Sequence, residues 1–290
     1  MAVTTIEAMV PVRLSGDGVR LTGVRFELLL QSLSLHWADA EPLRLTIVGL
    51  REELPVLREI ARARPGLALR FLDERELIDD LRFLVLPGWF KQSLVKLFFA
   101  RVCEADAYLY LDSDLICVRP LTRAHLLSDG RAVTGWEPKN THPGWWDGAR
   151  RVLKRASSDR RWGLAVTPNI FIAEVALAAL GAVERANRTP PLDALLAATG
   201  DASTCWVENT LYSELAEVSG DLDRWHTPLS HPTPFRSAAD LWSPDGLADW
   251  RPVEALTAAP GTRFVVVQST IGLDPAYIRQ RLSPVMDARA

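Results

Sequence analysis

The sequence contains few cysteines and no long apolar run, so it does not have the features of disulfide-rich, zinc-binding or membrane-spanning proteins. Its three cysteines, Cys103, Cys117 and Cys205, are odd in number and lack the close spacing of a zinc site, which indicates small, reduced core residues. The longest uncharged apolar runs, LVLPGWF and FVVVQ, fall well short of the roughly 18 to 20 residues that span a bilayer. The first residues lack the pattern of a signal peptide. We therefore expect a soluble, cytoplasmic protein.

Basic charge is not in excess either. The formal net charge is -3 and the pI is about 6.0, and only four lysines accompany the arginines, which are scattered along the chain. These values argue against a nucleic-acid partner. Ten tryptophans are present, several of them in polar, proline-rich stretches. Exposed indoles commonly cover the faces of sugars or mark interfaces.

The chain is long enough, and at 48% apolar residues hydrophobic enough, for one large domain with a sizeable core. Strand and helix patterns alternate in the first 72 residues, as strand Ile6–Leu14, helix Val24–Trp37, strand Leu43–Val48, helix Glu52–Arg64 and strand Leu67–Leu72. This alternation predicts parallel pairing with right-handed crossovers. We expect an α/β fold with a mostly parallel central sheet, helices on both faces and a second half rich in loops.

The pattern after Pro120 is looser. Strands are expected at Ala132–Trp136, at Gly163–Ile172 with an interruption at Pro168, and at Arg263–Gln268. Helices are expected near Gly148–Arg155, Ala173–Glu184, Pro190–Ala198 and Val207–Val218. Residues Asp221–Pro260 are rich in Pro, Trp, His and Asp with little periodicity, which indicates ordered loops.

The stretch from Gly88 to Leu121 is the most informative part of the chain. Its helix, Lys91–Glu104, is apolar on more than one face, and the following run, Ala107–Leu111, contains no charge. Such a run is typical of a central strand that is covered on both sides. Asp112 follows it directly and therefore lies at the carboxyl end of the strand, where open α/β sheets bind ligands.

Asp112 and Asp114 form an Asp-x-Asp triplet at this strand end. A triplet of this kind is weak evidence alone, and the chain contains a second one, Asp221 and Asp223, which we interpret as a solvated turn because no apolar strand precedes it. Two carboxylates so close together at a strand end repel each other unless a cation lies between them or one is protonated. Mg²⁺ and Mn²⁺ supply that charge and accept carboxylate oxygen.

With these elements the chain resembles the metal-dependent GT-A glycosyltransferases, which transfer sugar from a nucleotide diphosphate. It is most similar to a bacterial GT-A family with a G-W-x-x-Q-x-x-x-K helix, an apolar strand and D-x-D. The best-matching part covers about 35 residues from Gly88, and weaker similarities lie at Thr167–Val175, Trp206–Tyr212 and Val266–Ser269. The resemblance implies a GT-A fold over residues 1–290, with residues 1–121 binding the nucleotide sugar and residues 122–290 binding the acceptor.

The resemblance also implies roles for residues of the best-matching part. Asp114 would be the main metal ligand, and Asp112 would help to bind the metal, the ribose or the diphosphate, with Ser113 between them. Gln92 and Lys96 would lie beside the donor, where Lys96 could meet phosphate as a point charge. An ordinary helix lysine that reaches into water is the alternative for Lys96.

Other parts of the site would come from elsewhere in the chain. Pro11, Val12 and Arg13 end the first strand, where such folds hold the nucleotide base, although a plain strand end is an equal alternative. GT-A enzymes often complete the metal site with a histidine from the C-terminal part. His231 is preferred slightly over His226 for this role, and a surface or hydrogen-bonding histidine is the alternative.

Glu208 is the candidate general base, since an inverting enzyme needs a carboxylate to take the proton of the acceptor hydroxyl. The alternative is a glutamate favoured by the helix dipole, and in a retaining enzyme it would hold the sugar or the acceptor instead. Trp145, Trp146, Trp162 and Trp206 could stack on sugars, although each is individually more typical of a core.

The predicted function is sugar transfer, dependent on Mn²⁺ or Mg²⁺, from a nucleotide-diphosphate donor to a hydroxyl of a glycan, a lipid-linked or a small-molecule acceptor. One alternative is a silent GT-A domain that only binds carbohydrate. The other is a haloacid-dehalogenase-like phosphatase, which also ends a strand in D-x-D but carries that motif near the N-terminus, with Thr or Val where this chain has Ile116.

Overall fold

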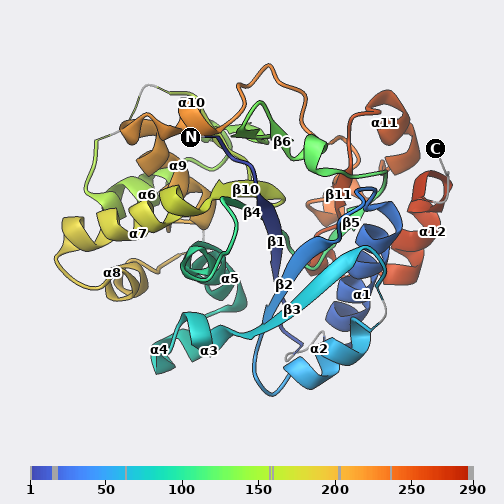
Figure 1. Cartoon of the computed structure of the whole chain (residues 1–290), viewed down its shortest axis with the longest axis horizontal. Coiled ribbons are helices and arrows are strands. Elements are labelled where there is room, and N and C mark those ends of the chain that lie inside the picture. The colour runs from blue at the N-terminus through green and yellow to red at the C-terminus, as the bar shows by residue number, and fades with distance from the viewer. Residues whose placement is uncertain are drawn as a thin grey trace. The chain divides into compact units, whose positions relative to one another are not determined.

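The structure, a computed structural model, describes residues 2–14, 19–62, 64–156, 158, 160–201, 204–235 and 237–286. Five strands form the central sheet, in the order β10-β4-β1-β2-β3. They are β1 Ile6–Pro11, β2 Leu43–Gly49, β3 Leu67–Asp73, β4 Ala107–Tyr110 and β10 Asn169–Ile172. The pairs β1–β2 and β2–β3 are parallel, and β10 is antiparallel to β4 (Figure 1). The predicted fold class, α/β with a mostly parallel sheet and flanking helices, is confirmed.

The chain forms two compact units, each drawn from three segments. The first unit contains Met1–Glu7, Glu74–Tyr110 and Leu127–His231, and the second contains Ala8–Asp73, Leu111–Leu126 and Pro232–Ala290. Neither unit is one continuous stretch. The assignment of residues 1–121 to the donor and 122–290 to the acceptor therefore stays a prediction about function.

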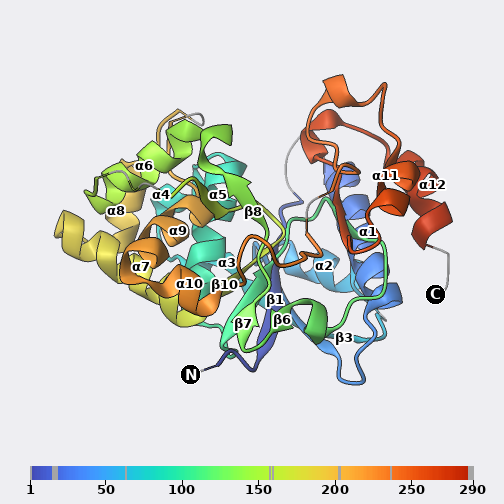
Figure 2. The same ribbon diagram turned by 90° about the horizontal axis from the view of Figure 1, so that it is seen from above.

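The second unit contains β2, β3 and a two-stranded antiparallel ribbon of β5 (Leu115–Cys117) with β11 (Phe264–Val266). Its helices are α1 Val19–His36, α2 Leu54–Ile60, α11 Pro252–Ala258 and α12 Pro275–Met286. Helix α12 packs on α1 and α11 (Figure 2). Helix α1 buries Phe26, Leu29, Leu30 and Leu33, whose spacing puts them on one face. Apolar residues of the ribbon, α11 and α12 form one core cluster, which fixes the ribbon in this unit.

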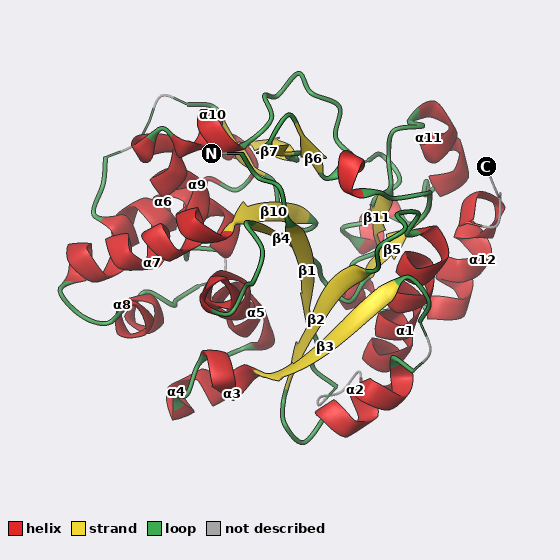
Figure 3. Ribbon diagram, in the orientation of Figure 1, coloured by secondary structure: helices red, strands yellow, loops and turns green. Residues whose placement is uncertain are grey.

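The first unit is mostly helical (Figure 3). Its helices are α3 Glu74–Leu77, α4 Leu81–Leu84, α5 Gly88–Phe98, α6 Pro143–Leu153, α7 Ala173–Asn187, α8 Pro191–Ala197, α9 Glu208–Ser219 and α10 Asp221–Trp225. Its short strands are β6 Leu127–Ser128, β7 Arg131–Ala132, β8 Trp136–Pro138 and β9 Trp162–Leu164. Tyr108, Phe171 and Tyr212, from β4, β10 and α9, pack ring against ring in the core. Helices α5 and α7 both contact α9, so α9 is central to this unit.

Three predictions about local structure are wrong. The stretch Asp221–Pro260, expected as ordered loops, contains the helices α10 and α11. No single strand runs over Ala132–Trp136, because β7 ends at Ala132 and β8 begins at Trp136. Between them the backbone N–H groups of Thr134 and Gly135 donate to side-chain oxygens of Thr227 and Asn169, at 3.1 and 3.3 Å, and not to a neighbouring strand.

The second Asp-x-Asp triplet is also not a turn. Asp221 and Asp223 form the first turn of α10, which follows Gly220 in the left-handed conformation (φ 79°) at the end of α9. A helix N-terminus favours carboxylates, because the backbone N–H groups there carry partial positive charge. The helices of the described residues include none that is both long and apolar enough to span a membrane.

Candidate functional site

The Asp112-Ser113-Asp114 triplet lies in the second unit, in the turn that joins the end of β4 to β5. Strand β4 ends at Tyr110, and the next residue, Leu111, still donates its N–H to the Met9 carbonyl at 2.9 Å. The prediction that the aspartates directly follow a buried strand is therefore confirmed. All three residues of the triplet are half-buried.

Asp114 is held by the segment that follows β11. Its Oδ2 accepts a hydrogen bond of 2.8 Å from the Ser269 N–H, and its backbone carbonyl accepts one of 3.2 Å from the Val267 N–H. Burial, and then the nearby charge of Asp112, raise the pKa of Asp114 to about 6. Two carboxylates with this mutual repulsion gain from a cation between them.

The donor set at this turn fits a hard divalent cation. Carboxylate oxygens are the ligands that Mg²⁺ and Mn²⁺ prefer, and two such groups leave room for phosphate oxygens and water. The described residues contain no group of three or more His, Cys, Asp or Glu side chains placed to hold a metal. Asp112 and Asp114, in the second unit, are the carboxylates at this turn that could hold such a cation.

The end of β1 lies in the same unit. Pro11 pairs with Val48 of β2, and Val12 donates its N–H to the Val48 carbonyl at 2.8 Å. Pro11 and Val12 are buried, and Arg13 is half-buried. A nucleotide base at this strand end stays a prediction.

The first unit brings together Lys96 and Glu208, which are 112 residues apart in the sequence. Lys96 Nζ of α5 lies 3.0 Å from Glu208 Oε1 at the start of α9, and Ser93 Oγ donates to Glu208 Oε2 at 2.6 Å. Lys96 and Glu208 are only 3% and 6% exposed, so Lys96 does not reach into water. Burial raises the pKa of Glu208, but Lys96 and Ser93 outweigh it and lower the pKa overall. Gln92, one turn before Lys96, is half-buried.

The two candidate histidines differ in their surroundings. His226 is 1% exposed, and its ring nitrogens lie 2.9 Å from Thr134 Oγ1 and 2.8 Å from the Tyr212 hydroxyl. Burial, and then the charge of Arg160, lower the pKa of His226 to about 3. These contacts give His226 a structural role. His231 lies at the end of the first unit and is half-buried, and its role as a metal ligand stays a prediction.

The tryptophans divide by exposure. Trp146 and Trp206 are 1% and 0% exposed, so they belong to the core. Trp145 is half-buried and stacks on His142, with 3.9 Å between the ring centroids. Trp162 is 37% exposed. Of the four, Trp145 and Trp162 are accessible enough to meet a sugar.

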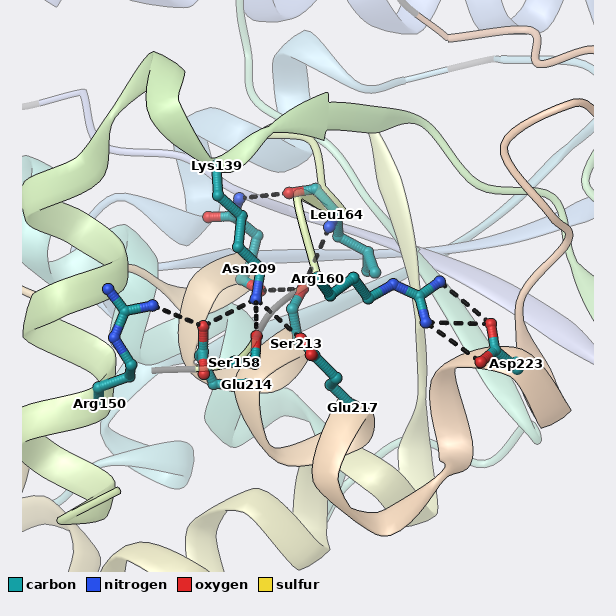
Figure 4. Close-up of polar contacts among 10 residues, drawn as sticks. All are labelled: Lys139, Arg150, Ser158, Arg160, Leu164, Asn209, Ser213, Glu214, Glu217 and Asp223. Atoms are coloured by element: carbon teal, nitrogen blue, oxygen red, sulfur yellow. Dashed lines mark hydrogen bonds and ion pairs between the residues drawn. The ribbon is translucent and has the colours of Figure 1, made fainter. Parts of the chain in front are cut away.

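A buried ionic network lies beside α9 in the first unit (Figure 4). Lys139 Nζ lies 2.9 Å from Glu214 Oε1 and 2.8 Å from Glu217 Oε2, and Arg150 Nη1 lies 3.2 Å from the same Glu214 oxygen. Glu214 is 1% exposed. In the same view Arg160 pairs with Asp223 at 3.1 Å at the surface. The network joins α6 and the residue after β8 to α9, and none of it was expected from the sequence.

Sequence reasoning also missed Ser269, and Arg25 of α1, whose guanidinium donates to the Val267 and Leu273 carbonyls on either side of Ser269. Ser269 carried a weak signal, since it belongs to the Val266–Ser269 segment that resembles the glycosyltransferases. Arg25 carried none, because an arginine within an amphipathic helix is normally at the surface.

Comparisons with known proteins agree on the fold. A sequence model of a family of unknown function, DUF6492, matches residues 3–289. Mouse xyloside xylosyltransferase 1 in its apo form is similar in structure, with a TM-score of 0.54 and 12% identity over 93% of this chain and 100% of that one. The bifunctional glycosyltransferase WbbM is also similar, with a TM-score of 0.52 and 12% identity over 90% of this chain and 45% of that one. No curated protein matches the sequence.

Proposed function

The chain belongs to DUF6492, a family of unknown function, and we propose that it is a metal-dependent glycosyltransferase that uses a nucleotide-diphosphate sugar. The observation that carries this proposal is the pair Asp112 and Asp114 directly after a buried strand, on a fold shared with solved glycosyltransferases. At 12% identity that likeness concerns the fold, so the activity is argued from the site residues.

In this proposal Asp112 and Asp114 hold Mn²⁺ or Mg²⁺, with His231 as a further ligand. The bound metal would neutralise the charge that develops on the departing diphosphate. The hydrogen bond from Ser269 to Asp114 Oδ2 supports this role, because it fixes one oxygen of the carboxylate and so orients the other. Ser113 and the β1 end, Pro11, Val12 and Arg13, would bind the nucleotide.

Lys96 and Gln92 are proposed to lie beside the donor, and Glu208 to act on the acceptor. The lowered pKa of Glu208 keeps it ionised, as a base must be before it takes a proton. Both carboxylate oxygens accept hydrogen bonds, from Ser93 and Lys96, and each keeps a second lone pair that could take a proton. If the reaction retains configuration, no such base is required, and Glu208 instead holds the sugar or the acceptor.

The proposed acceptor is a hydroxyl group of a glycan, a lipid-linked molecule or a small molecule. The two structural neighbours are glycosyltransferases by their names, which supports sugar transfer as the class of reaction. The three free cysteines are in keeping with a reducing compartment, and we place the activity in the cytoplasm.

Two substitutions test the proposal against a panel of nucleotide sugars with Mn²⁺, read as donor hydrolysis. Asp114→Asn keeps the shape of the side chain and removes the charge that would hold the metal. We expect turnover to fall at least about 100-fold, the size of effect seen when a group that stabilises transition-state charge is lost. Asp223→Asn is the matched control, because it makes the same change in the second Asp-x-Asp triplet, and it should leave turnover unchanged. Equal turnover in wild type and Asp114→Asn would refute the metal site, and nucleotide-sugar binding without turnover in wild type would favour a silent binding domain.

A further inference from the structure

Arg25 is a buried arginine in the second unit whose two guanidinium nitrogens bind main-chain carbonyls. It lies on α1 and is 4% exposed. Its Nη1 donates to the Val267 carbonyl at 2.7 Å, and its Nη2 donates to the Leu273 carbonyl at 2.9 Å. A buried guanidinium is costly, and a well-packed apolar side chain is often at least as stabilising. The arginine therefore needs an explanation beyond packing.

The two carbonyls lie at either end of the segment that holds Asp114. Between them runs the short 3₁₀ turn Ser269–Ile271, closed by Gly272 in the left-handed conformation (φ 73°). Ser269 in this turn donates its N–H to Asp114 Oδ2, and Val267 donates its N–H to the Asp114 carbonyl. The guanidinium of Arg25 thus holds Val267 and Leu273, the two ends of this segment, and Ser269 between them holds the Asp114 carboxylate.

The opposite charges of Arg25 and Asp114 also support a link between the two residues. Burial lowers the pKa of Arg25, and the charge of Asp114 opposes that effect. An arginine here supplies a positive charge to the carboxylate and a rigid, two-pronged geometry to the turn, whereas lysine would supply the charge alone.

We propose that Arg25 is a positioning residue for the aspartate pair: by clamping residues 267–273 to α1, it orients the Asp114 carboxylate for a divalent cation. This inference rests on the proposed metal site at Asp112 and Asp114. Residues that orient metal ligands commonly change metal affinity by about 10- to 100-fold when they are replaced.

The test measures Mn²⁺ affinity of the full chain by electron paramagnetic resonance, without any sugar donor, so that it does not depend on turnover. Arg25→Lys keeps the charge and removes the two-pronged clamp, and Arg25→Met removes both. Arg119→Met is the matched control. Arg119 belongs to the same unit and also binds main-chain carbonyls, those of Leu256, Ala259 and Thr262, but its bonds do not hold the Ser269 turn.

If the clamp orients Asp114, Arg25→Lys and Arg25→Met both weaken Mn²⁺ binding by about 10- to 100-fold, and Arg119→Met leaves it unchanged. Tighter binding in Arg25→Met with unchanged binding in Arg25→Lys would show that Arg25 acts only through its charge, and would overturn the proposal. So would a loss in Arg119→Met equal to that in Arg25→Lys. If Arg25→Met fails to fold, the result for Arg25→Lys decides.

Asp114→Asn separates this inference from the proposed function. A large loss of Mn²⁺ affinity in Asp114→Asn with none in Arg25→Lys overturns the role of Arg25 alone. Wild-type affinity in Asp114→Asn, or no binding of Mn²⁺ by the wild type, overturns the metal site and the role of Arg25 together.

Discussion

Lys96 and Glu208 form a buried ion pair, with 3.0 Å between Nζ and Oε1, that joins α5 to α9 in the first unit. Their side chains are 4% and 8% exposed. The ammonium also lies 5.5 Å from the centroid of the Tyr110 ring, the last residue of β4. A single pair therefore connects the helix and the strand of the most informative stretch of sequence to the helix that carries the candidate base.

Breaking this pair from one side should destabilise the fold. Glu208→Gln leaves the Lys96 ammonium buried beside a neutral group, and we expect the free energy of unfolding to fall by about 3 kcal/mol. Urea unfolding measures this. The double variant Glu208→Gln/Lys96→Met removes both charges and should recover part of the loss. A cost below about 1 kcal/mol in Glu208→Gln would contradict a tightly held pair.

The pair shows what helical periodicity can and cannot supply. The sequence predicts that Lys96 and Glu208 lie on helices, because apolar residues recur at helical intervals around each. Periodicity gives the inward face of a helix but not the helix that it faces. The pairing of residues so far apart depends on the packing of α5 against α9, which no local pattern encodes, so an exposed Lys96 remained an open alternative.

His226 should make stability depend on pH. Its folded pKa of about 3 lies below the ordinary value of about 6.5, so between these values the unfolded chain binds a proton that the folded chain does not. The contribution of His226 is therefore fully present above about pH 6.5 and is lost as the pH falls. From pH 7 to pH 5 we expect the contribution of His226 to the free energy of unfolding to fall by about 2 kcal/mol, as measured by urea unfolding.

The variant His226→Gln isolates this effect. Gln can still bond to the Tyr212 hydroxyl or to Thr134, the two groups that face the ring, but it does not titrate. The other histidines are the same in both proteins and cancel. The variant should be less stable than the wild type at pH 7 and should lose about 2 kcal/mol less on going to pH 5. An identical pH dependence in the two proteins would contradict the shifted pKa.

The network of Lys139, Glu214, Glu217 and Arg150 should contribute strongly to stability. Glu214→Gln removes the buried negative charge that both Lys139 and Arg150 contact. Lys139 then keeps only Glu217 of its two carboxylate partners, and Arg150 keeps only Asp147 at the surface. We expect the free energy of unfolding to fall by about 3 kcal/mol, by urea denaturation.

Asp223→Asn is the control for this network, because it breaks an ion pair drawn in the same view (Figure 4) whose side chains are 28% and 80% exposed. Exposed pairs contribute little, so the cost should stay below about 1 kcal/mol. The argument from burial would be wrong if the two variants lost the same stability.

The sequence indicates the elements of the fold more reliably than the contacts of the site. Alternating patterns suffice for β1, β2 and β3, because each is a mostly apolar run between stretches with helical periodicity. The turn predicted at Asp221 and Asp223 is wrong, since Gly220 before them suits a turn as well as the junction of two helices. The hydrogen bond from Ser269 to Asp114 joins residues 155 positions apart and depends on the register of β5 with β11. A single sequence contains no local signal for that register.

Gly163 of β9 should not tolerate a side chain, because a Cβ there would overlap the ring of Trp146, which is 1% exposed and itself surrounded. The backbone of Gly163 is outside the left-handed region, so Gly163→Ala is unfavourable for steric reasons alone, because the indole of Trp146 must move. We expect the free energy of unfolding to fall by about 2 kcal/mol or more. The near-ultraviolet circular dichroism signal of the tryptophan should change as well. Gly200→Ala is the control in the same unit, since a Cβ at Gly200 has no heavy atom within 4 Å among its non-adjacent neighbours, and it should change stability by less than about 0.5 kcal/mol. Equal melting temperatures for the two variants would show that β9 can move away from Trp146, and the close packing of this strand on α6 would then not be what holds the indole in place.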